Sequence, residues 1–248
     1  MKKYKAVIFD LFDTLIDFNR DSIPEISING NNLRSTVKGV YEVFCGYYGS
    51  IEIENFYNAF IESYNEFQLM KQKEFREFPV EERFKLLLKK LNIGLNSNYY
   101  RAVGEMALSH MESLANSMEF PEENREVLNK IYKDNYTMSI ISNFDHAPTV
   151  YMLLDSFDLR TFFEAIVISI EVSWRKPKAD IFLKALNFLK LSSNEAIYIG
   201  DNFEADIIGS KNVGMDSIWI NKNNETREEP PIKPDYTVSS FSELGNLF

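Results

Sequence analysis

The stretch Val7-Ile8-Phe9-Asp10-Leu11-Phe12-Asp13-Thr14-Leu15 carries the signal from which the architecture of this chain follows. An apolar run ends there in an acidic residue, as in a buried strand of a parallel sheet. Runs of the same kind recur at residues 138–143, 165–171, 196–201 and 217–221. Amphipathic helical patterns lie between the later runs, such as the stripe after Pro177, a residue type favoured at the first helical position. This alternation predicts an α/β fold with a doubly wound, Rossmann-like parallel sheet.

The pattern changes between residues 17 and 118, where apolar residues recur at helical spacing and no strand–helix alternation is evident. One such stripe consists of Phe56, Phe60, Tyr64 and Phe67. The α/β pattern resumes near Pro121, where acidic residues suit the first turn of a helix. We therefore predict an α/β core formed by residues 1–16 and 119–248, interrupted by an inserted all-helical domain at residues 17–118.

Composition narrows the possible partners of the chain. Its 248 residues are 45% hydrophobic and 26% charged, which is typical of a globular protein, and no apolar run approaches the roughly 20 residues that a membrane span needs. A net charge of −10 without a basic stripe argues against nucleic acid as a partner. A single cysteine, Cys45, favours a reducing, cytoplasmic location. The oligomeric state cannot be inferred from these features.

Polar side chains follow several of the predicted strands. Because the carboxyl ends of parallel strands meet at one edge of a sheet, residues at these ends converge although they are far apart in sequence. Each group alone also fits a turn or a helix cap, but together, each after a predicted strand, they indicate a site. The groups are Asp10, Ser142-Asn143, Lys176-Pro177 and the segment Gly200-Asp201-Asn202-Phe203-Glu204-Ala205-Asp206.

These four groups, in this order, resemble the motifs of the haloacid dehalogenase superfamily of hydrolases, whose core is interrupted by a cap that closes over the active site. The resemblance implies that Asp10 is a catalytic nucleophile, and that Lys176 is a catalytic residue that neutralises the nucleophile and the phosphate. The substrate-binding residues that it implies are Thr14, Ser142, Asn143 and Lys176. The Mg²⁺ ligands that it implies are Asp10, Asp201, the backbone carbonyl of Phe12, and Asp206, directly or through a water molecule.

Position 12 departs from the phosphatases of this superfamily, most of which carry a second aspartate there as general acid and base. Phenylalanine cannot transfer a proton, and a positioned general acid or base contributes about 10²- to 10⁴-fold to rate. Asp13, Asp145 or His146 could substitute, although Asp13 would face a different side from Phe12 if the backbone stayed extended. Alternatively the substrate has a good leaving group, such as an acyl or aryl phosphate.

Three hypotheses for function follow. The favoured one is a Mg²⁺-dependent phosphatase that acts on a small phosphorylated metabolite through an aspartyl-phosphate intermediate. The second is a 2-haloacid dehalogenase, because expulsion of halide needs no proton and the dehalogenases of the superfamily also lack the second aspartate. These enzymes need no metal, however, whereas the acidic segment around Asp201 looks intact. The third is a non-catalytic binder of phosphorylated metabolites.

Overall fold

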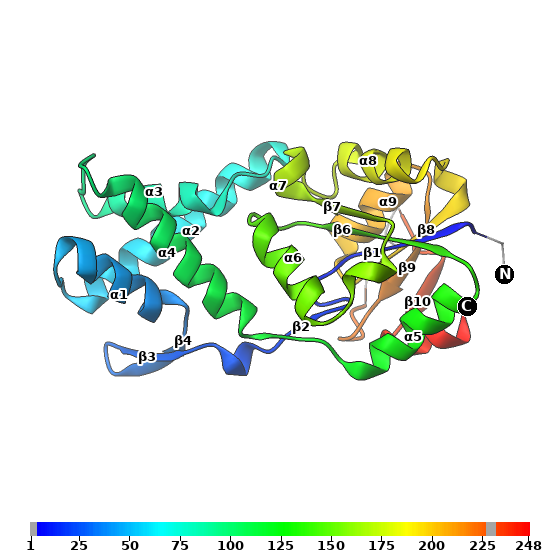
Figure 1. Cartoon of the computed structure of the whole chain (residues 1–248), viewed down its shortest axis with the longest axis horizontal. Coiled ribbons are helices and arrows are strands. Elements are labelled where there is room, and N and C mark those ends of the chain that lie inside the picture. Colours follow the sequence, from blue (N-terminus) through cyan, green and yellow to red (C-terminus); the bar gives the residue numbers. More distant parts are fainter. Residues whose placement is uncertain (1–3, 227–231) are drawn as a thin grey trace. The chain divides into compact units, whose positions relative to one another are not determined.

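The structure is a computed structural model that describes residues 4–226 and 232–248. The chain divides into two compact units, one formed by Met1–Phe18 with Glu119–Phe248 and the other by Asn19–Met118. The chain leaves and re-enters the first unit through the short strands β2 (Asp17–Phe18) and β5 (Met118–Glu119), which form a two-stranded ladder (Figure 1). Throughout the described ranges, the helices are too short or too polar to span a lipid bilayer.

The first unit is built on a sheet of parallel strands in the order β10-β9-β8-β1-β6-β7. The chain runs from β1 outward through β6 and β7, and then crosses to β8 on the other side of β1. This topology confirms the predicted doubly wound sheet, and it places the switch point, where such sheets bind ligands, between β1 and β8. The strands are β1 (Ala6–Phe9), β6 (Thr137–Ser142), β7 (Ala165–Ile168), β8 (Ala196–Gly200), β9 (Asp216–Ile220) and β10 (Tyr236–Val238).

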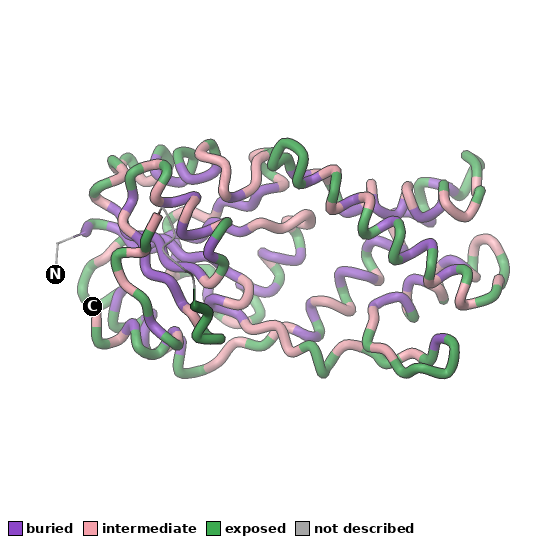
Figure 2. The backbone as a smooth tube through the Cα atoms, turned by 180° about the vertical axis from the view of Figure 1, so that it is seen from behind, coloured by how far each residue is buried: buried purple, intermediate pink, exposed green. Residues whose placement is uncertain are grey.

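Helices flank this sheet and bury its strands. Figure 2 shows buried positions gathered in the interior of this unit, and every residue of β1 and β8 is buried. Helix α8 (Ala179–Leu189) packs its predicted apolar stripe, including Phe182, against Ile8 and Tyr198. The other α-helices of this unit are α5 (Glu122–Lys133), α6 (Ala147–Ser156), α7 (Ser169–Val172) and α9 (Gly209–Asn212). Short 3₁₀ helices lie at Arg160–Phe162, Ser193–Glu195 and Ser242–Asn246, and Phe203–Ile208 forms a π-helix.

Two predicted boundaries in this unit are wrong. Helix α8 (Ala179–Leu189) begins two residues after Pro177 rather than at it. The Asn143 side chain bonds to the backbone N–H and carbonyl of Lys176 and holds that residue outside the helix. The strand expected at residues 165–171 ends at Ile168. Ser169 begins a short helix there, and its hydroxyl bonds to both backbone groups of Phe144.

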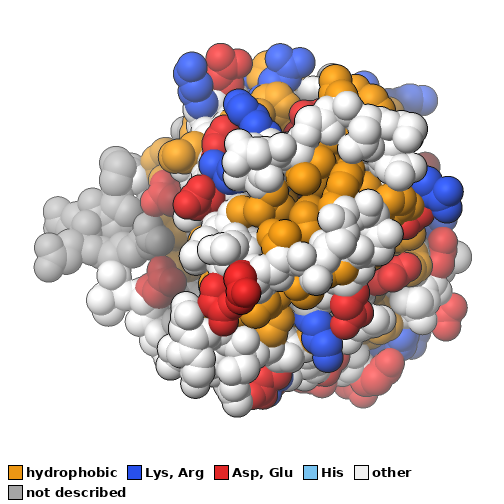
Figure 3. Space-filling view, turned by 90° about the vertical axis from the view of Figure 1, so that its left-hand side faces the viewer, with side chains coloured by type: hydrophobic (Ala, Val, Ile, Leu, Met, Phe, Trp, Pro, Cys, Tyr) orange, Lys and Arg blue, Asp and Glu red, His pale blue; other side chains and the backbone are white. Residues whose placement is uncertain are grey.

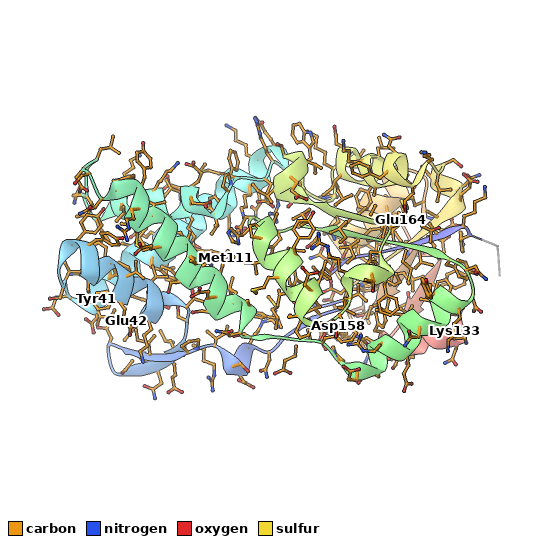
Figure 4. The ribbon with its side chains drawn as sticks, in the orientation of Figure 1. Tyr41, Glu42, Met111, Lys133, Asp158 and Glu164 are labelled. Carbon is orange, nitrogen blue, oxygen red and sulfur yellow. The ribbon has the colours of Figure 1, made fainter. Side chains whose placement is uncertain are left out.

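The second unit consists mainly of the helices α1 (Val37–Tyr48), α2 (Ile53–Glu74), α3 (Val80–Lys90) and α4 (Tyr99–Ala115), preceded by the short turn Arg20–Ser22. Helices α1 and α4 pack side by side, and Met111 of α4, marked in Figure 4, is buried in this unit. Phe56, Phe60 and Phe67 of the predicted stripe are also buried. Figure 3 shows hydrophobic side chains gathered on the surface at the left-hand end of Figure 1, where these helices lie.

The insert is not helical throughout, which corrects the prediction of an all-helical domain. Strands β3 (Glu25–Ile28) and β4 (Asn31–Arg34) form an antiparallel hairpin. Its two-residue turn, Asn29-Gly30, has φ angles of 50° and 75°. Positive φ at both turn positions matches the twist of paired strands, and Asn-Gly is a strong sequence signal for such a turn. The helical apolar stripes elsewhere in the insert do not extend over this turn, so the turn signal decides the local structure.

Candidate active site

The carboxyl ends of the strands on either side of the switch point border a cavity of about 230 Å³ in the first unit. Asp10 follows β1, and its backbone N–H donates to the carbonyl of Ile199 in β8 at 2.8 Å. The segments after β6 and β7 contribute further polar residues. The lining residues are Asp10, Phe12, Asp13, Ser142, Asn143, Arg175, Lys176, Asp201, Asn202, Ala205 and Asp206.

A buried lysine connects two carboxylates at the base of the cavity. The Lys176 ammonium lies 2.5 Å from Asp10 Oδ1 and 2.7 Å from Asp206 Oδ1, and all three residues are at least nine-tenths buried. It also donates to the carbonyl of Ile141 at 3.0 Å and to the hydroxyl of Tyr198 at 2.8 Å. An ammonium group has three protons, so these four acceptors use its full donor capacity, with one proton shared between two of them. The lysine is therefore fixed beside Asp10.

Asn143 sets the position of this lysine through its backbone. The side-chain Oδ1 of Asn143 accepts from the Lys176 N–H at 2.8 Å, and its Nδ2 donates to the Lys176 carbonyl at 3.0 Å. Of the basic residues that flank Lys176 in sequence, Arg175 lines the cavity, whereas Lys178 places its ammonium over the ring of Trp174. Lys176 is thus the residue of this basic run that contacts the carboxylates.

Asp206 is held on several sides by its neighbours. Its Oδ2 accepts from the backbone N–H of Asn202 at 2.9 Å, and its Oδ1 accepts from the Tyr198 hydroxyl at 3.1 Å as well as from Lys176. Gly200 leaves room for this carboxylate, since a Cβ built at position 200 would lie 2.4 Å from Asp206 Oδ2. Asp206 therefore positions Lys176, and its close packing depends on a glycine at the end of β8.

Asp201 completes an acidic group at the cavity. The carboxylates of Asp10, Asp201 and Asp206 offer oxygen atoms that all lie within 4.8 Å of one another. The Thr14 hydroxyl donates to Asp201 Oδ1 at 3.3 Å, and the Trp219 indole N–H donates to the Asp201 carbonyl at 2.8 Å. Thr14 itself is fully buried. It therefore acts on the acidic group through Asp201.

The pKa values of two of these carboxyls are raised. Burial raises the pKa of Asp10 to about 7, Lys176 opposes this shift, and the charges of Asp206 and Asp201 add to it. Burial and the charge of Asp206 raise the pKa of Asp201 to about 6. The single positive charge of Lys176 does not balance three carboxylates. The excess negative charge disfavours ionisation of the Asp10 and Asp201 carboxyls. Oxygen ligands carrying excess negative charge are the donor set that Mg²⁺ prefers, so these residues fit that ion.

Ser142 contributes a polar atom to the cavity lining. Its residue is 1% exposed, and within the described part of the chain its hydroxyl oxygen has no hydrogen-bond partner. A buried hydroxyl without a partner is costly, and a bound group with suitable oxygens removes this cost. A phosphoryl group at the cavity would supply such oxygens.

The segment after Asp10 is not extended, contrary to the condition under which Asp13 was expected to face away from Phe12. Asp13 has a φ of 59°, in the left-handed region, and its N–H donates to the carbonyl of Ile16 at 2.8 Å. Phe12 and Asp13 consequently line the same cavity. Among the described lining residues there is neither Asp145 nor His146, and His146 Nδ1 lies 2.8 Å from the Thr149 hydroxyl.

The structure thus places the sequence-predicted site residues along one cavity, except Thr14, which lies outside the lining and contacts it through Asp201. Sequence reasoning missed Tyr198, Asn202 and the packing role of Gly200. The available signal for Tyr198 was a polar hydroxyl in the middle of an otherwise apolar run. A buried tyrosine hydroxyl needs a partner, and the residues that end neighbouring strands supply one.

Comparison with known proteins establishes the family. Residues 51–220 match the model of the haloacid dehalogenase-like hydrolase family, and the chain belongs to that family. The matched region includes Ser142, Lys176, Asp201 and Asp206, whereas Asp10 precedes it.

Curated relatives and solved structures extend this similarity. The chain is 28% identical to the glyceraldehyde 3-phosphate phosphatase of Pyrococcus furiosus, over 98% of the chain and 92% of the relative. It is 36% identical to the pyrimidine 5'-nucleotidase YjjG of Escherichia coli, over 49% of the chain and 53% of the relative. A 2-haloacid dehalogenase from Pseudomonas syringae has a TM-score of 0.74 at 20% identity, covering 98% of this chain and 97% of that one. The magnesium-bound structure of the putative HAD-hydrolase YfnB from Bacillus subtilis has a TM-score of 0.64 at 19% identity, covering 99% of each chain. At these identities, the two structures show the shared fold alone.

Proposed function

We propose that this chain is a Mg²⁺-dependent phosphatase that hydrolyses a small phosphorylated metabolite through a phosphorylated Asp10. The observation that carries the proposal is the buried Asp10–Lys176 pair beside the acidic group of Asp10, Asp201 and Asp206 in one cavity. The names of the two relatives described above support it, since both denote enzymes that act on phosphate esters.

Asp10 is the proposed nucleophile: one of its carboxylate oxygens attacks phosphorus, and the bond from phosphorus to the ester oxygen breaks with its electron pair leaving on that oxygen. The Lys176 ammonium, 2.5 Å from Asp10, lowers the repulsion between this carboxylate and the incoming phosphate and favours the ionised carboxylate. The Ser142 hydroxyl donates to a phosphoryl oxygen, and the Asn143 side chain keeps Lys176 in place. Water then hydrolyses the aspartyl phosphate and restores Asp10.

The metal site of the proposal uses the oxygen atoms nearest the nucleophile. Asp10, Asp201 and the backbone carbonyl of Phe12 would hold Mg²⁺, with Asp206 beside it orienting a water molecule or ligating directly. The ion, when bound, supplies positive charge that stabilises the transferring phosphoryl group. Asp206 already serves as an acceptor for Lys176, Tyr198 and Asn202, which favours the orienting role.

The second unit is proposed as a cap that selects the substrate and excludes bulk water that would weaken the electrostatic interactions around the metal. Small phosphorylated molecules, rather than nucleic acid or membrane, are the proposed partners, in keeping with the acidic net charge. The proposed location is the cytoplasm.

The proposal is tested by measuring phosphate release from a broad panel of phosphate esters, with Mg²⁺ and with a chelator. We expect release that requires Mg²⁺ and that Asp10→Asn abolishes, because the amide cannot act as the nucleophile. Asp155→Asn, which changes an exposed carboxylate that pairs with Arg160 outside the cavity, is the matched control and should retain activity. Release that persists in the chelator or in Asp10→Asn contradicts the proposal.

Phe12 supports one competing function, the hydrolysis of carbon–halogen bonds. In that reaction Asp10 attacks carbon, and halide leaves without needing the proton that position 12 cannot supply. The three-carboxylate group disfavours this function, because attack on a haloacid gains nothing from additional anionic groups. Halide release from a 2-haloacid in the absence of Mg²⁺, without phosphatase activity, would establish it in place of the phosphatase.

A further inference from the structure

The cavity lining is polar or charged except at Phe12 and Ala205. The ring of Phe12 packs against Phe144, with centroids 4.7 Å apart and planes inclined by 38°. Both rings are partly exposed. An aromatic side chain, Phe12, therefore lines a cavity that otherwise favours anionic and polar groups, and Phe144 packs against it from outside the lining.

Hydrogen bonds hold the backbone at both members of this aromatic pair. The Ser169 hydroxyl accepts from the Phe144 N–H at 2.9 Å and donates to the Phe144 carbonyl at 3.1 Å. Phe12 forms an isolated β-bridge with Ile16, and the next residue, Asp13, donates its N–H to the Ile16 carbonyl. A surface fixed before binding loses little freedom when a ligand packs on it, which favours affinity for a matching shape.

The chemistry of position 12 also restricts the leaving group of the substrate, independently of the packing of the two rings. Phenylalanine cannot protonate the departing oxygen, so the leaving group must carry away negative charge without help from this residue. Leaving groups that tolerate the charge are weak bases, such as phenolates, in which the charge is delocalised over a planar π system. A planar π system is also the partner that an aromatic surface prefers, through offset or edge-to-face packing.

We propose that Phe12 and Phe144 form a leaving-group subsite and that the preferred substrates are phosphate esters with a planar, weakly basic leaving group, represented by aryl phosphates. This inference rests on the proposed phosphatase function. As Asp10 forms its bond to phosphorus, the bond from phosphorus to the aryl oxygen breaks, and its electron pair leaves on the phenolate. The phenolate takes its proton from bulk water, and a second water molecule hydrolyses the aspartyl phosphate.

The test compares phenyl phosphate with cyclohexyl phosphate, whose ring is similar in size but saturated, together with phenyl phosphates carrying substituents that change the pKa of the phenol. The Mg²⁺-loaded enzyme should show kcat/KM that rises steeply as the pKa of the leaving phenol falls, and it should prefer the phenyl ester. Phe12→Leu and Phe144→Leu remove one ring each but supply no proton donor. Phe188→Leu, at a ring that is 56% exposed on α8 and outside the cavity, is the control.

In Phe12→Leu and Phe144→Leu, the ratio of phenyl to cyclohexyl kcat/KM should fall by about 2- to 12-fold, the range expected for one aromatic contact. The dependence on leaving-group pKa should stay steep in both, because neither change adds or removes a proton donor. A purely structural effect of these variants would lower both substrates equally and would overturn the subsite. A shallow dependence on leaving-group pKa in the wild type overturns the substrate class while leaving the phosphatase function standing. Absence of Mg²⁺-dependent phosphate release from every ester removes the phosphatase function and this inference with it.

Discussion

Gly200→Ala adds one methyl group at the end of β8 and tests how Asp206 is held. The added Cβ would lie 2.4 Å from Oδ2, 2.5 Å from Cγ and 2.7 Å from Cβ of Asp206. The strand cannot move away easily, because β8 pairs with β1 on one side and β9 on the other. The Asp206 side chain must therefore shift from its contacts with the Asn202 N–H and the Lys176 ammonium.

The magnitude follows from two costs. Overpacking a close-packed interior costs about 1–3 kcal/mol, and loss of one buried hydrogen bond to a charged group costs about 1.5–3 kcal/mol. We therefore expect the free energy of unfolding to fall by about 2.5 to 6 kcal/mol, a large part of the total stability of a typical domain. Phosphatase activity should fall as well, since Lys176 loses one of the two carboxylates that position it.

Urea denaturation monitored by circular dichroism measures the stability, and phosphate release measures the activity. Gly104→Ala is the matched control, because no atom lies within 4 Å of a Cβ built at that position in α4. Alanine is favoured over glycine inside a helix, so this control should gain up to about 1 kcal/mol. A Gly200→Ala protein with wild-type stability and wild-type activity would refute the proposed close packing of Asp206.

Three further predictions concern charge. Lys176→Met leaves the Asp10 carboxyl buried without its cation, so we expect phosphate release to be lost and the unfolding free energy to fall by about 3–5 kcal/mol in urea denaturation; unchanged stability would argue against the pair. Because the pKa of Asp10 is raised to about 7, protons compete with Mg²⁺, and the ion should raise Tm more at pH 8 than at pH 5.5, whereas equal shifts would contradict this competition. His110 Nε2 must accept from Arg83, and burial together with that charge lowers the pKa of His110 well below 6.5. The unfolded chain then binds a proton that the folded chain does not, so stability should fall below pH 6.5 by up to about 1.4 kcal/mol per unit; the slope should weaken in His110→Gln, and a slope that is the same in both proteins counts against the buried neutral imidazole.

The sheet and the convergence of the site were predictable from sequence for a local reason. A buried parallel strand is a short apolar run, and the polar residue that ends it marks the edge of the sheet where ligands bind. Asp10, Ser142 and Asp201 each follow such a run. Their proximity in the folded chain could therefore be predicted without knowing how the side chains pack. Lys176 lies farther along, in the segment between β7 and α8, so the strand end alone does not place its side chain beside Asp10.

The remaining features depend on backbone angles and on partners distant in sequence. The left-handed conformation of Asp13 brings it to the cavity of Phe12, and alternation along an extended strand cannot anticipate it. The hydroxyl of Tyr198 meets Lys176 only because β8 and the loop after β7 are neighbours in the folded chain. The hairpin at Asn29-Gly30 is different, since its turn signal was present in the sequence and was outweighed by the helical stripes around it.

Covalent trapping of the phosphorylated enzyme identifies the nucleophile. The protein is mixed with Mg²⁺ and an aryl phosphate, quenched in acid within the first turnover, digested, and analysed by mass spectrometry. We expect one phosphoryl group on the peptide that contains Asp10, absent when Mg²⁺ is chelated and absent in Asp10→Asn. Rapid phosphate release with no phosphoryl group on that peptide, or with the group on another residue, would contradict the assignment of Asp10 as the nucleophile.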